Sequence, residues 1–509
     1  MAIRPPEGYL GATARITSGP APELVAAGYA LETADAPLLH RDLTLADLAH
    51  LSELAACGAV SREDAAPVAA VLLRLLDTPA GDFPYDPVYG DAYNSREREL
   101  ERVLGRAAGR LHLGRTRREA GRIAFRLVLR DRLLSLHADV TAFARATASQ
   151  EARNAGTLWA DTTYLQPAQP STFGHYLGGF AEQALRHLDR IQAAYTLADV
   201  SPAGAGGVGG SRLPHDRDRL AGALGFGAVG QHTRDAMWST DPLADAVLAA
   251  VLATQMLSQL ASDLEIFASP GFGYVTLDAS LCRASVLMPQ KRNPYALPVL
   301  RGGAGTLAGR LTGLLATGFT PSARTDNWLY AYGEVAGALD LASRLVRLGS
   351  AVVAGLSVHD DVLASQAASH FTAGADLAEE LTQRFRLDYR TAYRIVGRAV
   401  ASIVADGGGE LTVPALRSAT TEIAGTELPV TADLLDAVAE PAAAAEARRA
   451  PGGASPARVR DHARRVRRRA AAAGRWNAAR RARNAQAEAG LIAAATALAA
   501  TESEGEDGA

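Results

Sequence analysis

Lysine is almost absent from this chain. Lysine and arginine together fill 52 of its 509 positions, and Lys291 is the single lysine. Where arginine supplies nearly every cation, a surviving lysine indicates a position that needs a compact ammonium rather than a planar guanidinium. Lys291 is therefore the first candidate for a chemical role, and the alternative is a lysine retained by chance.

Cysteine and net charge are also scarce. Cys57 and Cys282 are too few for a disulfide framework and are typical of a reducing cytoplasm. No cysteine and histidine cluster has the spacing of a metal site, and we predict neither a metal nor a cofactor. The formal net charge of −3 argues against a general nucleic-acid-binding protein.

The sequence has no long hydrophobic run. Its N-terminus lacks the apolar core of a signal peptide. The longest uncharged apolar stretch, residues 246–262, contains polar side chains and is slightly too short to span a bilayer. We therefore expect a cytoplasmic protein without a membrane segment.

Helix-forming residues dominate what is present. Five segments of about 25 to 33 residues show helical periodicity, and they are 117–149, 173–199, 241–268, 295–319 and 333–357. Helices so much longer than the globular mean predict an elongated bundle. No alternating pattern is strong enough to predict a sheet.

We thus predict an all-α protein with a long-helix bundle core flanked by two smaller helical domains. The bundle spans residues 117–371, and the flanking domains span 1–116 and 372–470. Residues 471–509 are rich in arginine and alanine and then acidic, so we predict a flexible tail. Alanine interrupts the arginine run, which favours a solvated helix with a frayed end over a nucleic-acid-binding arm.

A glycine-rich motif at residues 204–209 matches the dinucleotide-binding fingerprint letter for letter. That fingerprint requires a preceding strand, whereas residues 175–197 have the pattern of a long helix. We interpret the motif as a crossover between bundle helices.

The connection between two of the long helices, residues 269–293, is the strongest candidate site because it is too long for a routine link. Ser285 is a weak base unless an ammonium and backbone N–H groups stabilise its alkoxide. Lys291 and Asn293 can hold a carboxylate that gains charge when the adjacent carbon loses its proton. These are the requirements of β-elimination from a succinyl group, and the alternative is a loop of unrelated polar residues.

This connection resembles the signature of the fumarase/aspartase superfamily, Gly-Ser-x-x-Met-x-x-Lys-x-Asn, with Ala284 in place of the glycine. Over roughly residues 30–470 the chain is most similar to the argininosuccinate lyase family. The resemblance is carried by residues 109–117, 163–170, 200–206, 272–275, 288–294 and 452–459. It implies an all-helical homotetramer that acts on a small molecule, with four active sites each built from three subunits.

The resemblance also implies roles for single residues. Ser285 is implied to be the catalytic base, with Lys291 beside it. Thr116 stands where the family has a serine. The residues implied to bind substrate are Thr163, Asn293, Thr116, Arg117, Asp91 and Gln166.

The departures from the family fall on the leaving-group side. Tyr164 replaces a histidine and Pro298 replaces the glutamate that pairs with it, so an acid pair is lost as a unit. We predict Tyr164 as the first candidate for the general acid, and the alternative is a tyrosine that fills space. Arg118 replaces an asparagine, and with Arg324 and Arg96 it suggests a different, more anionic partner. The alternative for Arg118 and Arg324 is that they form ion pairs.

The family residues that hold the amino-acid half of argininosuccinate align by count with Arg324, Leu329 and Tyr332. His112 and His175 are interpreted as structural.

We predict a carbon–nitrogen lyase that eliminates fumarate from an N-substituted aspartate or related succinate, or runs the reverse addition. The alternatives are a genuine argininosuccinate lyase, giving arginine and fumarate, and a non-catalytic structural homologue.

Overall fold

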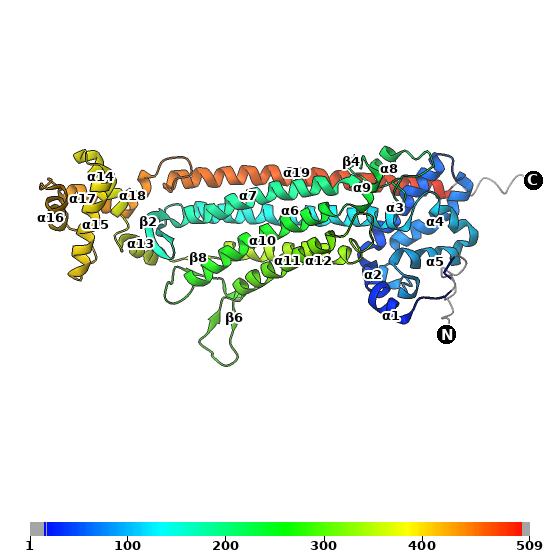
Figure 1. Ribbon diagram of the computed structural model, residues 1–509, viewed down its shortest axis with the longest axis horizontal. Helices are drawn as coiled ribbons and strands as arrows, with labels where there is room; N and C mark the ends of the chain where they lie inside the picture. Colours follow the sequence, from blue (N-terminus) through cyan, green and yellow to red (C-terminus); the bar gives the residue numbers. More distant parts are fainter. Residues whose placement is uncertain (1–14, 17, 501–509) are drawn as a thin grey trace, which may run out of the picture.

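The computed structural model describes residues 15–16 and 18–500, and in this part of the chain the predicted all-α fold is confirmed (Figure 1). The described strands form only four two-stranded pairs. They are β1 (Leu158–Thr163) with β2 (Gln166–Thr172), β3 (Val200–Ser201) with β4 (Ala228–Val229), β5 (Val275–Thr276) with β8 (Ser357–Val358), and β6 (Arg283–Ala284) with β7 (Arg292–Asn293).

The five predicted long helices form the centre of an elongated molecule (Figure 1). They are α6 (Arg117–Arg153), α7 (Phe173–Ala198), α10 (Asp241–Phe267), α11 (Ala296–Gly318) and α12 (Ala331–Ala354). At 1.5 Å per residue, α6 alone is roughly 55 Å long. Alanine and leucine from all five helices fill the largest hydrophobic core.

Threonine side chains fix where the first two long helices begin. Thr116 Oγ1 accepts a hydrogen bond from the Glu119 N–H at 3.3 Å, and Thr172 Oγ1 accepts one from the His175 N–H at 3.2 Å. Each cap satisfies an N–H group that the helix itself leaves without a partner. The start of α6, which carries three of the predicted site residues, is therefore fixed locally.

Helix α10 is the one described helix long and apolar enough by composition to cross a membrane. However, 56% of its most apolar window is buried inside the molecule, where it packs against α7, α11 and α12. Its hydrophobicity is that of a core helix in a bundle.

Smaller helical units with their own cores lie at the two ends of the bundle. The N-terminal unit contains α1 (Pro22–Leu24), η2 (Val25–Tyr29), α2 (Ala30–Ala34), α3 (Ala36–Ala56), α4 (Arg62–Asp77), η3 (Ala80–Asp82), η4 (Pro87–Tyr89), α5 (Ala92–Leu104) and η5 (Gly105–His112). The opposite end contains α13 (Asp360–Ala368), α14 (Gly374–Phe385), α15 (Tyr389–Ala405), α16 (Val413–Ala424), α17 (Ala432–Ala439) and α18 (Pro441–Ala447). Connections between bundle helices contain α8 (Arg217–Ala223), α9 (Thr233–Trp238) and η6 (Ala279–Leu281).

The tail predicted to be flexible from residue 471 differs in the structure, where it continues α19 (Pro456–Ala499). This helix packs along α6 and α7 and reaches α3 and α4 in the N-terminal unit. Its buried side chains recur at helical spacing and are mostly small, so it lies close to its neighbours. The acidic residues 501–509 lie outside the described residues.

His462 fastens the start of α19 to two bundle helices. Its Nδ1 lies 2.6 Å from Oε1 of the buried Glu151 on α6, and its Nε2 lies 3.1 Å from Glu182 Oε2 on α7. The hydrogen bond to Glu151 is the main cause that raises the His462 pKa above its ordinary value. The folded state therefore favours the imidazolium.

Replacement of His462 is expected to make stability less dependent on pH. A raised folded pKa stabilises the fold fully below the unfolded pKa of about 6.5, and this is lost as pH rises through the folded pKa. At pH 6, His462→Gln is expected to cost about 1.5–3 kcal/mol, the range for hydrogen bonds to charged groups. Denaturant unfolding at pH 6 and pH 9 checks this, with His370→Asn at an exposed histidine as the control. A deficit of equal size at both pH values would contradict it.

Candidate active site

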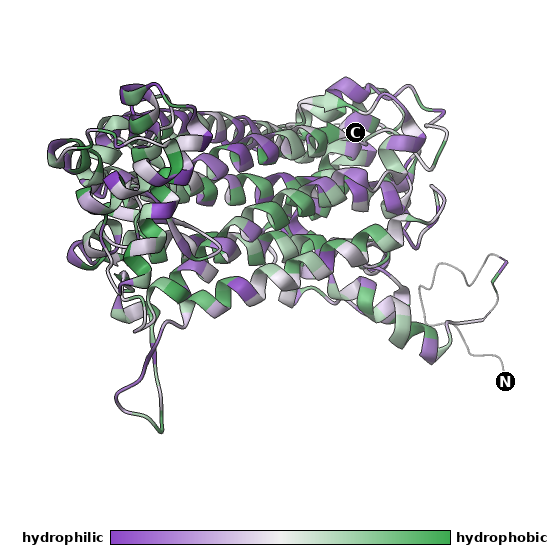
Figure 2. Ribbon diagram, turned by 60° about the vertical axis from the view of Figure 1, so that its left-hand side comes forward, coloured by the Kyte–Doolittle hydropathy of each residue, from purple (hydrophilic) through white to green (hydrophobic). Residues whose placement is uncertain are grey.

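The predicted catalytic loop projects from the side of the bundle between β6 and β7 (Figures 1 and 2). The register pairs Arg283 with Asn293, and the Asn293 side-chain amide donates to the Arg283 carbonyl at 3.0 Å. Ser285 and Lys291 therefore lie just beyond the paired residues, at opposite ends of one loop. We call residues 283–293 the signature loop.

Within the signature loop, backbone N–H groups point at the serine hydroxyl. Ser285 Oγ accepts hydrogen bonds from the N–H of Met288 at 3.0 Å and of Leu287 at 3.4 Å. Donors in this position stabilise negative charge on the oxygen, so the loop's own backbone favours the alkoxide. This is the arrangement that a serine base requires.

Two apolar residues of the signature loop are almost fully open to solvent. Relative exposure is 111% for Val286 and 86% for Leu287. Lys291 is also exposed, and its ammonium has no hydrogen bond or ion pair with any residue that the structure describes. Exposed apolar groups at the tip of a projecting loop indicate a surface that another molecule covers.

A second group of predicted residues lies at the tip of the β1–β2 hairpin. Thr163 pairs with Gln166, and Tyr164 and Leu165 form the two-residue turn between them with φ of 55° and 59°. Two positive φ values are typical of the tight turns that match strand twist. Tyr164 is 98% exposed.

A third group surrounds the start of α6. Asp91 caps α5 by accepting from the Asn94 N–H at 3.1 Å. Its carboxylate lies 3.8 Å from Arg117 and 3.7 Å from Arg118, and Arg118 also contacts Glu32 at 2.7 Å. Both guanidinium groups therefore have carboxylate neighbours. For Arg118 this agrees with the alternative stated above, in which it forms ion pairs instead of binding substrate.

A small pocket opens beside these residues. Its walls are Glu32, Asp35, Leu39, Leu43, Asp91, Ala92, Tyr93, Arg117, Arg118, Gly121, Leu329 and Tyr332. Burial raises the pKa of Asp35 to about 6. The lining thus holds three carboxyl groups and two guanidinium groups, and it lacks the surplus of positive charge that the arginines suggested. Arg324 is exposed between α11 and α12 and does not line the pocket.

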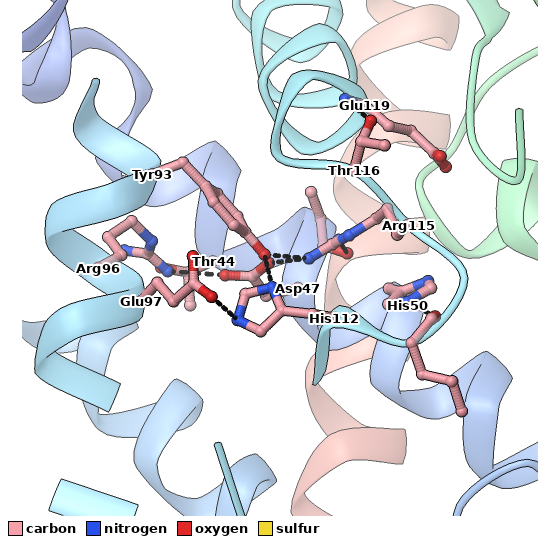
Figure 3. A network of polar contacts seen from close by, with 12 residues as sticks. Thr44, Asp47, His50, Tyr93, Arg96, Glu97, His112, Arg115, Thr116 and Glu119 are labelled. Carbon is pink, nitrogen blue, oxygen red and sulfur yellow. Dashed lines mark hydrogen bonds and ion pairs between the residues drawn. The ribbon is translucent and has the colours of Figure 1, made fainter. Parts of the chain in front are cut away.

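Arg96 belongs to a buried network and not to a binding surface (Figure 3), so the expectation that it faces an anionic partner is wrong. Its guanidinium donates to Asp47 at 3.1 Å and to Thr44 at 2.9 Å. Arg115 pairs with the same Asp47 carboxylate and donates to the Tyr93 hydroxyl at 2.8 Å. A buried guanidinium requires such compensation. Because Thr116 follows Arg115 directly, this network positions the third group.

Both histidines interpreted as structural have structural partners. His112 lies 3.2 Å from Glu97 and 3.4 Å from the Tyr93 hydroxyl, at the edge of the same network (Figure 3). His175 Nε2 lies 2.9 Å from the Gly452 carbonyl, which joins α7 to the segment before α19.

The glycine-rich segment at 204–209 packs against α6. The Gly204 N–H donates to Glu119 Oε1 at 2.6 Å, and a Cβ on Gly204, whose φ is +75°, would lie 2.8 Å from Arg217 Cγ. The two-residue strand β3 before it pairs only with β4. This pair is parallel but only two residues long, so the segment is a packed crossover that does not follow a strand of the extended parallel sheet that a dinucleotide fingerprint needs.

One chain does not bring the three groups together. Thr116 precedes α6 and the hairpin follows its far end, so a helix of roughly 55 Å separates them. The signature loop leaves the side of the bundle between these ends (Figure 1). The three groups therefore do not form one site within a single chain.

Comparison with known proteins places these features in a family. A family model described as a lyase matches residues 32–309. An argininosuccinate lyase from Methanoculleus marisnigri is 30% identical over 431 residues, covering 84% of this chain and 86% of that protein. EDDS lyase in complex with formate has a TM-score of 0.84 at 24% identity, covering 98% and 99% of the two chains. A fumarate lyase from Mesorhizobium sp. BNC1 has a TM-score of 0.65 at 19% identity, covering 84% and 95%.

Proposed function

The chain belongs to the lyase family within the fumarase/aspartase superfamily, and from this membership we propose that it is a carbon–nitrogen lyase of the argininosuccinate lyase type. Its substrate is an N-substituted aspartate or a related succinate, and it releases fumarate whichever amine departs. The same site supports the reverse addition of an amine to fumarate.

The observation that carries this proposal is the geometry of the signature loop. Two backbone N–H groups stabilise the Ser285 alkoxide, and the sole lysine lies in the same loop. The alkoxide removes the proton from the carbon next to one carboxylate. Lys291, Asn293 and Thr163 then hold the carboxylates and stabilise the charge that develops on them.

Elimination is completed when the carbon–nitrogen bond breaks and its electron pair leaves with nitrogen. The departing amine needs a proton, and the Tyr164 hydroxyl is our first candidate donor. Its place at the exposed hairpin tip fits this role only if another chain brings substrate to it. Arg117 adds positive charge near the carboxylates, whereas the charge of Arg118 is largely compensated by Glu32.

We further propose a homotetramer in which each active site takes one group of residues from each of three chains. The outward face of α11 supports this proposal, because its exposed residues are mostly small and uncharged. They are Pro298, Val299, Gly302, Gly305, Thr306, Ala308, Gly309, Thr312, Gly313, Leu315, Ala316 and Gly318, and Arg301 is the one exposed residue of this helix that carries a charge. Small residues let helices of neighbouring chains approach closely, and in a single chain this long and almost uncharged face of α11 is open to solvent.

A genuine argininosuccinate lyase is the second candidate, favoured by the relative that is 30% identical over most of the chain. The pocket beside Arg117 argues against it, since Leu329 and Tyr332 stand where that family has polar ligands.

A cytoplasmic location fits either candidate, because Cys57 and Cys282 are both free.

Mixed refolding of two inactive variants tests the shared site. Ser285→Ala and Thr163→Ala are each expected to be inactive alone. In a 1:1 mixture of symmetric oligomers, about a quarter of the sites draw both intact residues from different chains, so about a quarter of wild-type activity returns.

The controls are each variant refolded alone under the same conditions. Light scattering of the active species gives the number of chains. Activity in a monomer, or a mixture as inactive as its parents, would exclude sites shared in this way.

A further inference from the structure

A cleft of about 500 Å³ lies between α3, α6 and the second half of α19, beside the end of α8. Its apolar wall is formed by Leu38, Leu45, Leu127, Leu134 and Leu491, among others. The volume falls within the range of small-molecule sites. None of the residues in the three active-site groups lines it.

Four guanidinium groups line this cleft, and each is paired with a carboxylate. Arg41 contacts Glu488 at 2.6 Å, and Arg481 contacts Asp131 at 3.1 Å. Two further pairs lead out of the cleft: Arg130 with Asp199 at 3.0 Å and Arg132 with Asp340 at 2.8 Å. The arginines therefore leave no free positive charge for an anionic ligand.

Asp42 is the carboxylate that remains. It lines the cleft from α3 and has no hydrogen bond or ion pair with any residue that the structure describes. Burial is the main cause that raises its pKa to about 7, and Arg41 and Arg130 act in the opposite direction. A half-buried carboxyl group without a partner is costly unless it binds a proton or a cation.

We propose that this cleft is a binding site for a small primary amine with an aliphatic chain, held by an ion pair between its ammonium and Asp42. The single uncompensated carboxylate matches one positive charge. The leucine side chains around it match a short hydrocarbon chain, which leaves water when it binds. Because the cleft is remote from the signature loop, this inference is independent of the proposed reaction.

The site has a second consequence that can be measured. Near neutral pH, part of Asp42 is protonated, and an ammonium beside it favours the ionised form. Amine binding at pH 7 is therefore expected to release protons, so the measured binding enthalpy changes with the ionisation enthalpy of the buffer. The charged groups that face Asp42 are Arg41, Arg130, Asp131 and Glu488.

Titration calorimetry with pentylamine tests the proposal on the full-length protein, with pentanol as the uncharged analogue. Wild type is expected to bind pentylamine with proton release and to bind pentanol at least about 10-fold more weakly, as for loss of a charged hydrogen bond. Asp42→Asn removes the anchor and is expected to weaken pentylamine binding by a similar factor. Asp82→Asn, at an exposed carboxylate of the same unit, is the matched control and is expected to bind like wild type.

A steric variant separates loss of the site from loss of the fold. Ala485→Phe keeps Asp42 and fills the cleft from the exposed side of α19, so it is expected to abolish binding with little change in melting temperature. Equal binding of pentanol and pentylamine, unchanged binding by Asp42→Asn or Ala485→Phe, or no binding to wild type at millimolar pentylamine would each overturn the proposal. If Asp42→Asn does not fold, the pentanol and Ala485→Phe measurements decide.

Discussion

Ser285→Ala is expected to lower kcat by about 10²–10⁴-fold, the range for loss of a positioned proton-transfer group. The fold is expected to be unaffected, because Ser285 Oγ accepts hydrogen bonds only from its own exposed loop. Absorbance of the conjugated diacid follows fumarate formation, and thermal unfolding follows stability. Near-normal turnover by this variant would rule out Ser285 as the base.

Lys291→Arg is expected to lower kcat to a similar degree, although it conserves the charge. A guanidinium is wider than an ammonium and presents its donors in a rigid plane, so it cannot place the charge at the same point. Arg398→Lys, which makes the reverse change at an exposed ion pair between α15 and α16, is the matched control and is expected to retain activity.

Argininosuccinate is expected to be a poor substrate, by about 10⁴–10⁵-fold relative to a family enzyme whose polar ligands match it. The paired loss of histidine and glutamate at Tyr164 and Pro298 indicates a redesigned leaving-group side, since either loss alone would leave a damaged pair. The pocket beside Arg117 supports the same expectation. Tyr332 is buried there, and its hydroxyl already accepts a hydrogen bond from Arg122. Fumarate is expected instead from another N-succinyl compound or aspartate derivative.

A substrate panel followed by fumarate absorbance checks this, because fumarate is the common product whatever amine departs. Because three carboxyl groups line the pocket beside two paired arginines, the panel includes amines with an additional cation as well as anionic ones. Turnover of argininosuccinate at an ordinary rate of ~1–10³ s⁻¹ would overturn the substrate prediction. A silent panel, with fumarate also failing to bind, would favour a non-catalytic homologue.

The bundle was predictable because periodicity over long segments is a strong signal. The segment expected at 241–268 is α10 at Asp241–Phe267, and the one expected at 295–319 is α11 at Ala296–Gly318. The β1–β2 hairpin was not predicted, because Pro167 and Pro170 break any alternation in its second strand. Its tight turn shows itself only in the backbone of Tyr164 and Leu165.

Two other features depend on contacts that no local pattern reports. Nothing in the sequence near Arg96 indicates that its guanidinium is paired. The fold brings it to Asp47, which lies 49 positions earlier in the chain. The composition of residues 471–499 is typical of a low-complexity tail. In the structure they form the end of α19, which packs against α3, α4 and α6. The candidate site residues were found through the signature motif and the family resemblance, whereas their separation within one chain required the structure.

A crystal structure of the assembled enzyme soaked with fumarate tests the central claim most directly. The account predicts fumarate bound between Ser285 and Lys291 of one chain, Thr163 of a second and Thr116 of a third. Fumarate enclosed by residues of a single chain, or bound away from Ser285, would contradict it.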